Sequence, residues 1–368
     1  MKKLLLVLST LLMLLLAACS DSELCRFEGK ITNLEDDTVY VVFESAERSM
    51  VDTIECYQPG RFRTELLREE FQQATFFFDD QTAWFTVYLD DRQAKKIEIT
   101  GDIRFPALLY AKGGRTNNEL SSFRKKVESL LKEDTRIRKT IINASLTQSN
   151  ELISRAADIK NQLNEQALLY IQDNPGKASS VVLLKTYFAD PDDTRRIDEL
   201  LITLAPEIQD HYLVSDLQQY SIRAKRTALG AEAPDFTATN IYGNSVSLDS
   251  FPQKYVLLTF TAPWCDRCRT DELYLNEIDR KYKKDELEQL LITLDDDLPG
   301  LRTLLKSDSI GWNLIADSAG QATKLFDLYN VSILPRFFLI DDEGKIILKT
   351  EAGIEIKQTL ERLIPKET

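Results

Sequence analysis

Histidine is almost absent from this sequence of 368 residues, in which His211 is the only one. It lies in a stretch with a helical pattern, and no nucleophile motif stands near it, so hydrolytic chemistry that depends on a histidine base is close to excluded. Zinc is disfavoured as well, because the ligand candidates His211, Cys25 and Cys56 have no zinc-ribbon spacing. We therefore expect neither a metal nor a bound cofactor.

Basic residues are in the minority. Lysine and arginine number 46 against 59 aspartates and glutamates, which gives a formal net charge of −13. An acidic surface disfavours nucleic acid as a partner and does not attract anionic lipid electrostatically. Attachment to a membrane would have to depend on another feature of the sequence.

Long apolar runs are restricted to the start of the chain. Two lysines precede an apolar stretch at residues 4–16, and the sequence Leu-Ala-Ala-Cys follows and ends at Cys19. The stretch is short for a transmembrane helix and has the layout of an export signal. Its end resembles a bacterial lipobox, so cleavage before Cys19 and acylation of its thiol would tether the protein through lipid. An uncleaved anchor and a plain secretory signal are the alternatives.

The five cysteines fit an oxidising compartment. If Cys19 carries lipid and Cys265 pairs with Cys268, then Cys25 and Cys56 remain. These two could form a structural disulfide or stay as separate buried thiols.

The stretch around Cys265 and Cys268 carries the clearest chemistry. A strand-like apolar run at residues 255–261 leads through Ala-Pro-Trp into Cys-Asp-Arg-Cys, after which a helical pattern begins. Cys265 would lie at the first turn of a helix, where unpaired N–H groups stabilise a thiolate and lower its pKa below about 8.5. Cys268, one turn away, could attack a mixed disulfide on Cys265, so that the pair exchanges two electrons with a substrate disulfide. A zinc site and a purely structural disulfide are the alternatives.

Composition divides the rest of the chain into three segments after the signal at residues 1–19. Residues 20–112 have short runs of β-branched and aromatic residues between turn-forming groups, which predict an antiparallel β domain. Residues 113–228 predict a bundle of about five helices, rather than a dimerising coiled coil, because the heptads are not sustained. In residues 229–368, strands alternate with helices and end in a hairpin, which predicts a mixed sheet flanked by helices. We thus expect a multi-domain protein.

The last segment resembles the thioredoxin fold and, within it, the TlpA/ResA-like thiol-disulfide oxidoreductases of bacterial envelopes. The matching pieces are GAEAPDF at residues 230–236, SVSLDSF at 245–251, LLTFTAPWCDRC at 257–268 and VSILPRFFLIDDEGKI at 331–346. The whole layout, with a lipobox, a small β domain, helices and then this domain, resembles Bacteroidetes lipoproteins whose N-terminal domain has no known function.

This resemblance implies a set of site residues. Pro335 would follow a cis peptide bond and lie against the cysteines, which leaves the backbone before it free to pair with an extended substrate. Cys265 would be the nucleophile, Cys268 the resolving thiol, and Trp264 would shape the surface beside them. Asp271 stands where these enzymes usually have a glutamate that moves protons near the buried sulfur, although its side chain is shorter.

The resemblance also implies a function. These enzymes mostly reduce disulfides of exported proteins, for example to supply apocytochrome thiols before haem attachment, and a transmembrane electron donor recharges them. A thiol peroxidase shares the fold, but it would normally carry threonine at the position of Ala262. A lipoprotein that binds or scaffolds a partner is the alternative from another class, because fold alone does not fix function. We expect a lipid-anchored oxidoreductase that faces the periplasm from the inner or the outer membrane.

Overall fold

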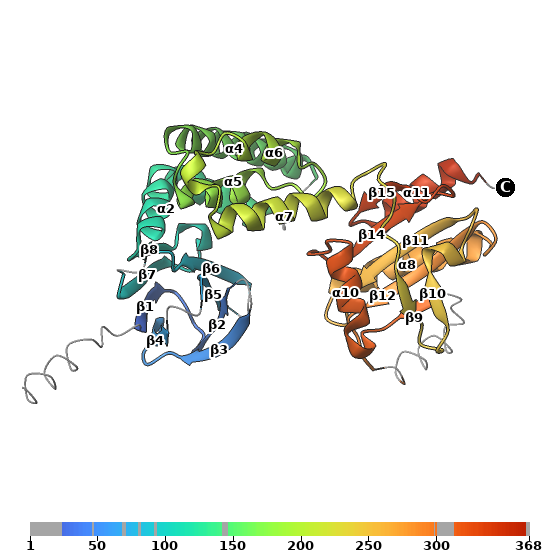
Figure 1. Cartoon of the computed structure of the whole chain (residues 1–368), viewed down its shortest axis with the longest axis horizontal. Coiled ribbons are helices and arrows are strands. Elements are labelled where there is room, and N and C mark those ends of the chain that lie inside the picture. Colours follow the sequence, from blue (N-terminus) through green and yellow to red (C-terminus); the bar gives the residue numbers. More distant parts are fainter. Residues whose placement is uncertain are drawn as a thin grey trace, which may run out of the picture. The chain divides into compact units, whose positions relative to one another are not determined.

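The computed structural model of the chain (Figure 1) describes residues 24–45, 48–67, 71–79, 82–91, 94–141, 146–297, 299 and 313–365. The predicted signal with Cys19 lies outside the described residues. Two compact units are formed, one by Met1–Phe188 with Thr203–Ser215 and the other by Ala189–Ile202 with Asp216–Thr368. Among the described residues, no helix combines the length and the apolar character needed to cross a membrane.

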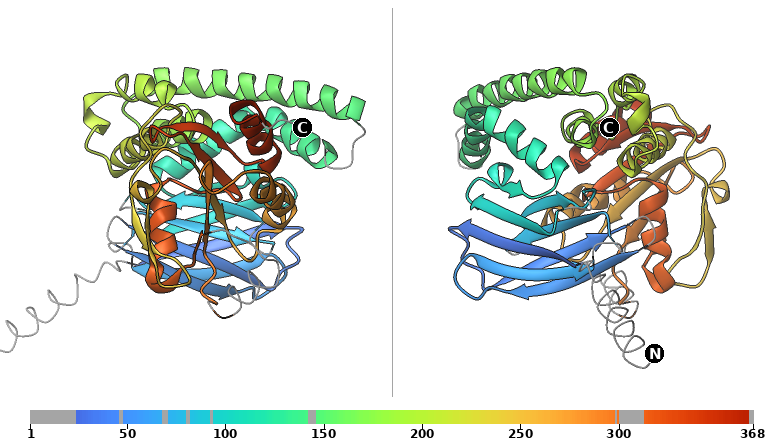
Figure 2. Two further views of the ribbon diagram at one scale, coloured as in Figure 1. Left: turned by 90° about the vertical axis from the view of Figure 1, so that its right-hand side faces the viewer. Right: turned by 60° about the vertical axis from the view of Figure 1, so that its left-hand side comes forward.

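The first unit begins with a β-sandwich of two four-stranded sheets, seen as blue to cyan layers in Figure 2. Its strands are β1 (Leu24–Thr32), β2 (Thr38–Glu44), β3 (Ser49–Glu55), β4 (Arg61–Leu67), β5 (Gln73–Phe78), β6 (Ala83–Tyr88), β7 (Lys96–Asp102) and β8 (Tyr110–Lys112). The strand orders are β4-β1-β7-β8 and β3-β2-β5-β6. All neighbours pair antiparallel except β1 and β7, which are parallel. The predicted antiparallel β domain is confirmed with this one exception.

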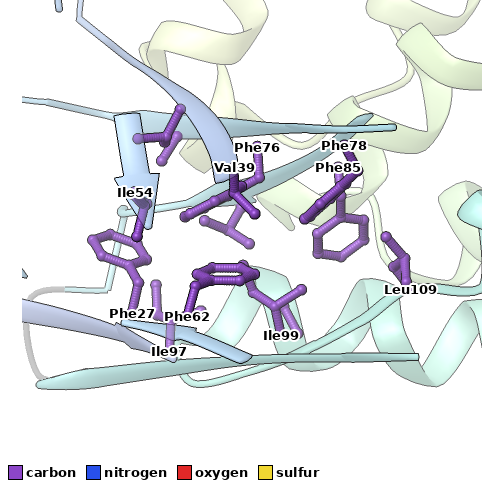
Figure 3. Close-up of a cluster of buried hydrophobic side chains, with 14 of the residues drawn as sticks. Phe27, Val39, Ile54, Phe62, Phe76, Phe78, Phe85, Ile97, Ile99 and Leu109 are labelled. Atoms are coloured by element: carbon purple, nitrogen blue, oxygen red, sulfur yellow. The ribbon is translucent and has the colours of Figure 1, made fainter. Parts of the chain in front are cut away.

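Aromatic side chains fill the space between the two sheets (Figure 3). The ring of Phe27 on β1 lies 5.7 Å from that of Phe76 on β5, and the ring of Phe62 on β4 lies 5.5 Å from that of Phe76. Gly29 pairs with Phe62 across β1 and β4. A Cβ atom at position 29 would lie 2.0 Å from the Phe62 ring, so the packing requires glycine there.

Cys25 and Cys56 do not form the disulfide that the cysteine count allowed. Cys25 is buried on β1 with its thiol 3.6 Å from the carbonyl oxygen of Ala94, whereas Cys56 follows β3 in the opposite sheet. Stacked sheets lie about 10 Å apart, which exceeds the Cα separation of about 7 Å that a disulfide tolerates. The two are therefore separate thiols, and burial, aided by the charge of Asp37, raises the pKa of Cys56.

Helices follow the sandwich, as predicted. They are α2 (Arg115–Lys126), α3 (Glu128–Ile141), α4 (Leu146–Asp173), α5 (Ala178–Phe188), α6 (Arg195–Leu201) and α7 (Tyr212–Arg226), with 3-10 turns at Pro106–Leu108 and Pro206–Ile208. Helix α2 is joined to β8 because the Ser121 hydroxyl accepts from the N–H of Ala111 and donates to its carbonyl oxygen. The segment between α5 and α6, α6 itself and α7 from Asp216 onward belong to the second unit.

The second unit contains a five-stranded sheet with the order β13-β12-β11-β14-β15. The elements from residue 237 onward are the hairpin β9 (Thr237–Thr239) and β10 (Ser245–Ser247), then β11 (Tyr255–Thr261), α8 (Asp266–Lys281), β12 (Leu287–Thr293), β13 (Asn313–Ile315), α10 (Gln321–Leu328), β14 (Arg336–Ile340), β15 (Ile346–Thr350) and α11 (Gly353–Leu363). Strands β11, β12 and β13 are parallel, and β14 runs antiparallel to β11 and β15. This is the predicted mixed sheet.

Both faces of the sheet are covered, which explains the unbroken apolar run of β11. On one face, Leu257 packs with Leu275 of α8 and Ile356 of α11. On the other face, Phe260 packs with Phe326 of α10 at a ring distance of 5.1 Å. Because β11 is held centrally, the turn at its C-terminal end has a fixed position.

Candidate redox site

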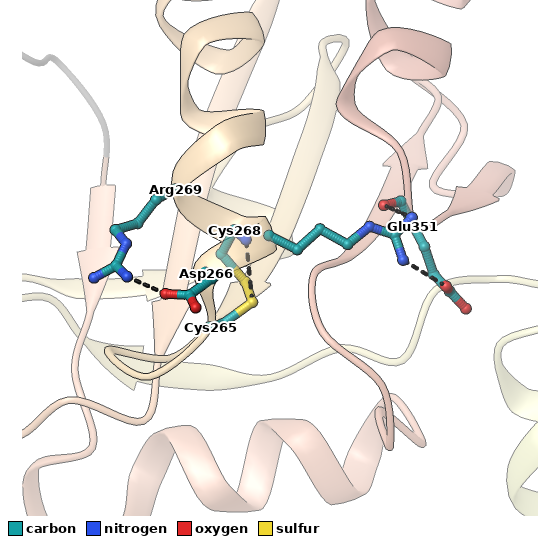
Figure 4. Close-up of a disulfide and its surroundings, with 6 residues drawn as sticks. Cys265, Asp266, Cys268, Arg269 and Glu351 are labelled. Carbon is teal, nitrogen blue, oxygen red and sulfur yellow. Dashed lines mark hydrogen bonds and ion pairs between the residues drawn. A yellow bond between two sulfur atoms is a disulfide. The ribbon is translucent and has the colours of Figure 1, made fainter. Parts of the chain in front are cut away.

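The two cysteines of the motif lie where β11 passes into α8. A turn at residues 262–264 follows the strand, and Cys265 is the N-cap of α8. Cys265 and Cys268 are joined by a disulfide (Figure 4). The backbone N–H of Cys268 donates to the sulfur of Cys265 at 3.1 Å. A thiolate at this position would keep that N–H and the positive end of the helix dipole as stabilising partners.

The surroundings of the disulfide are unevenly exposed. Cys265 is 9% exposed, Cys268 is half-buried, and the Trp264 side chain beside them is 69% exposed. In this disulfide form, Cys265 is therefore buried, although we expected it from the sequence to be the attacking thiol. Trp264 lies at the surface, as the resemblance implies.

Charged residues of the motif are paired on two sides of the disulfide. Asp266 forms an ion pair with Arg269, and the Arg267 guanidinium donates to the backbone oxygen of Glu351 at 3.0 Å and lies 3.4 Å from its carboxylate. Figure 4 shows Arg269 and Glu351 on opposite sides of the disulfide. Neither Asp266 nor Arg267 thus acts on the sulfurs as an uncompensated charge.

Pro335 is buried and follows a cis peptide bond with Leu334. It immediately precedes β14, and the register of β14 on β11 pairs Arg336 with Phe260. Pro335 thus lies beside the end of β11 that leads into the cysteine motif. The cis geometry is the one that the resemblance implies. The register of β14 on β11 begins at Arg336, so the backbone before Pro335 lies outside this ladder.

Asp271 is on α8, one turn beyond Cys268, and is 8% exposed. Residues three apart on a helix share a face, so the carboxylate is on the side of Cys268. It packs against Gly353, the first residue of α11, where a Cβ atom would lie 3.2 Å from the Asp271 Oδ1 atom.

A residue that the sequence-based set lacks is Arg336, which directly follows Pro335. Its side chain is 9% exposed and forms ion pairs with Asp192 at 2.7 Å and Glu351 at 3.5 Å. Asp192 precedes Arg336 by 144 positions, in the segment between α5 and α6. No local pattern of the sequence could have indicated this pair.

Comparison with known proteins gives a consistent family. The model of the AhpC/TSA family matches residues 229–349. The thiol-disulfide oxidoreductase ResA of Bacillus thuringiensis subsp. konkukian (strain 97-27) is 31% identical over 151 residues, which cover 41% of this chain and 85% of that protein. ResA of Geobacillus kaustophilus (strain HTA426) is 30% identical over 141 residues, 38% of this chain and 79% of that protein.

Two solved structures are similar to parts of the chain. The thioredoxin domain of a thiol-disulfide oxidoreductase from Bacteroides vulgatus is 28% identical, with a TM-score of 0.34 over 37% of this chain and 98% of that one. A thioredoxin-like protein from Bacteroides caccae covers 62% of this chain and 88% of its own, at 21% identity and a TM-score of 0.44.

Proposed function

Because the chain belongs, through its C-terminal domain, to the TlpA/ResA-like thiol-disulfide oxidoreductases of the thioredoxin superfamily, we propose that it reduces disulfides of exported proteins through Cys265 and Cys268. The observation that carries the proposal is the placement of this cysteine pair at the first turn of α8, beside the backbone at Pro335. The enzyme class follows from the family, whereas the direction of electron flow and the roles of single residues are our proposal.

The first step is attack by the Cys265 thiolate on one sulfur of a substrate disulfide. A mixed disulfide forms between Cys265 and the substrate, and the other substrate sulfur leaves as a thiolate that takes up a proton. The helix N-terminus stabilises the attacking thiolate, and the N–H of Cys268 is its hydrogen-bond donor. An extended substrate segment pairs with the free backbone before Pro335 and so presents its sulfur to Cys265.

The second step releases the substrate. Asp271 accepts the proton of the Cys268 thiol, and the resulting thiolate attacks the Cys265 sulfur. The second substrate sulfur leaves as a thiolate, and the Cys265–Cys268 disulfide forms. Two electrons have passed to the substrate, so a dithiol donor must return two electrons before the next turnover. We place this donor in a membrane and the protein in the bacterial envelope, held by a lipid on Cys19.

The reduction potential of the cysteine pair tests the direction. The purified full chain is equilibrated in graded thiol/disulfide buffers, and Cys265 and Cys268 are counted by mass tagging. A potential of about −270 mV or lower supports a reductase, and disulfides of apocytochromes are then one substrate class to test. A potential near about −120 mV identifies an oxidant instead. A pair that stays in one state across the range would leave a binding or scaffolding lipoprotein as the better proposal.

The match to the AhpC/TSA family favours a thiol peroxidase as the second candidate. Peroxide consumption by the reduced protein tests it directly. The buried Ala262, at the position where a peroxidase would normally carry threonine, disfavours this chemistry. A double variant, Cys265→Ser with Cys268→Ser, separates both redox functions from scaffolding, since a scaffold keeps its biological role without the thiols.

A further inference from the structure

A carboxylate from outside the family-matched region lies next to the residue that follows Pro335. Asp192 belongs to the second unit, although it precedes that region in the sequence. Its Oδ1 atom lies 2.7 Å from a guanidinium nitrogen of Arg336 and 2.9 Å from the ammonium of Lys349. The same ammonium donates to the carbonyl oxygen of Pro191 at 2.8 Å. One acidic turn thus binds two cations of neighbouring strands.

The side chains of the two cations are buried, so their positions depend on the anion that pairs with them. The side chain of Arg336 is 9% exposed and that of Lys349 is 2% exposed, whereas that of Asp192 is 49% exposed. Both cations lie over the ring of Phe338, at 5.8 Å and 5.9 Å. Burial lowers the pKa of Lys349, and the hydrogen bond to Asp192 opposes this shift. A buried cation that loses its anion is strongly disfavoured, so Asp192 holds both side chains in place.

The turn that carries Asp192 is itself held. The N–H of Asp192 donates to the Asp190 carboxylate at 2.8 Å, which closes the turn around Pro191. Burial and then the charges of Asp190 and Asp192 raise the pKa of Tyr220 on α7 to about 12. Asp192 is therefore presented to Arg336 in a defined geometry.

Arg336 connects this turn to the site. It is the first residue of β14, directly after Pro335, and its guanidinium is held by Asp192 and by Glu351. Glu351 also pairs with Arg267 of the cysteine motif. A chain of alternating charges therefore runs from Asp192 to the motif, and the strand end at Pro335 lies within it.

We infer that Asp192 is a positioning residue for substrate docking. It holds Arg336 and, through Arg336, the backbone at Pro335 with which an extended peptide pairs. The inference rests on the proposed reductase function and assigns a role in it to the segment between α5 and α6. The affected substrates are peptides and proteins that occupy this backbone, whereas a small aromatic disulfide needs only the sulfurs of the motif.

The test compares Asp192→Asn with Asp193→Asn in the full chain. Asp193 is the matched control, because it carries the same charge in the same turn and pairs with the exposed Arg195. For Asp192→Asn, we expect kcat/KM toward a disulfide-bonded peptide to fall about tenfold or more, mainly through KM. The rate with a small aromatic disulfide and the reduction potential should stay at the wild-type values. Asp193→Asn should match the wild type in all three measurements, and Asp192→Glu should restore part of the peptide rate.

Two results would overturn the inference. One is equal peptide kinetics for Asp192→Asn and Asp193→Asn. The other is an equal loss for peptide and small disulfide, or a shifted potential, because Asp192 would then act on the cysteines or on the fold as a whole. If Asp192→Asn does not fold, Arg336→Lys must show the same selective loss of peptide rate, or the inference fails. A wild-type chain that reduces no disulfide refutes the proposed function instead.

Discussion

Gly353 controls the space around Asp271, so Gly353→Ala tests the proposed proton acceptor without changing its chemistry. A Cβ atom at position 353 would lie 3.2 Å from the Asp271 Oδ1 atom, 3.3 Å from its Cβ atom and 3.2 Å from the Tyr274 ring. Ordinary contacts between such atoms are about 3.5–4.0 Å, so the neighbours must move by a few tenths of an ångström. Asp271 and Tyr274 are both on α8, which therefore must shift or turn its side chains away from α11.

The magnitude follows from two opposing terms. Overpacking of this size costs about 1–3 kcal/mol, whereas replacing a helical glycine by alanine gains up to about 1 kcal/mol. We expect a net loss of about 1 kcal/mol, which lowers the Tm of the second unit by about 2–4 °C. A displaced Asp271 should slow the attack by Cys268 about threefold to tenfold, because catalytic geometry tolerates small errors poorly. The first attack by Cys265 should keep its rate.

Quenched-flow measurements separate the two steps, since acid quenching preserves the mixed disulfide with a peptide substrate. Gly353→Ala should accumulate this adduct, and Asp271→Asn should accumulate more. Gly176→Ala is the matched control, because the added Cβ atom would be 3.6 Å from Ala205, an ordinary contact. If Gly353→Ala lowers the Tm but leaves the decay of the adduct unchanged, Asp271 does not serve the resolving step.

Three further predictions concern other parts of the molecule. Cys268→Ser should trap a stable mixed disulfide visible by mass spectrometry, and trapping by the reciprocal serine variant instead would reverse the assigned order of attack. Gly29→Ala should destabilise the sandwich by at least about 3 kcal/mol in urea unfolding, because the buried Phe62 ring occupies the position of the new Cβ atom; a smaller loss would show that the ring moves. The hydrogen bond from the Arg104 side chain lowers the pKa of Asp102 to about 2, below the value of about 3.9 in the unfolded chain. The ionised Asp102 therefore stabilises the folded state fully above about pH 3.9, and this stabilisation is lost as the pH falls toward about 2. Asp102→Asn should therefore cost about 1 kcal/mol at pH 7, after allowance for screening, and almost nothing near pH 2; equal costs at both pH values would contradict this.

Local patterns in the sequence predicted the parts of the fold that depend on local signals. The apolar run at residues 255–261 is a strand buried on both faces, and the helix expected after Cys265 begins at Asp266. Local patterns could not predict which strands pair when they are far apart in the sequence. Alternation along β1 and β7 shows which residues are buried, but it does not contain the information that these two strands run parallel.

Non-local placement also explains why the sequence left the state of Cys25 and Cys56 open. Cysteine counting cannot tell which sheet a strand enters, and Cys25 and Cys56 occupy opposite sheets. The pairing of Asp192 with Arg336 was missed for the same physical reason, since 144 residues separate them. The roles of Pro335 and Asp271 remain predictions that the geometry permits.

The pairing of charges around the disulfide limits what can activate Cys265. Asp266 and Arg267 carry opposite charges within the motif, and each is already paired with a residue of opposite sign, Arg269 and Glu351. Their fields at the sulfurs therefore largely cancel, and the oriented N–H of Cys268 at the start of α8 is the remaining stabilising group. Such a group acts at short range and is insensitive to salt, in contrast to exposed ion pairs. The acidic surface of the protein can thus vary without changing the chemistry of the thiols, while Glu351 joins the motif, through Arg267 and Arg336, to the strand end for which we propose substrate docking.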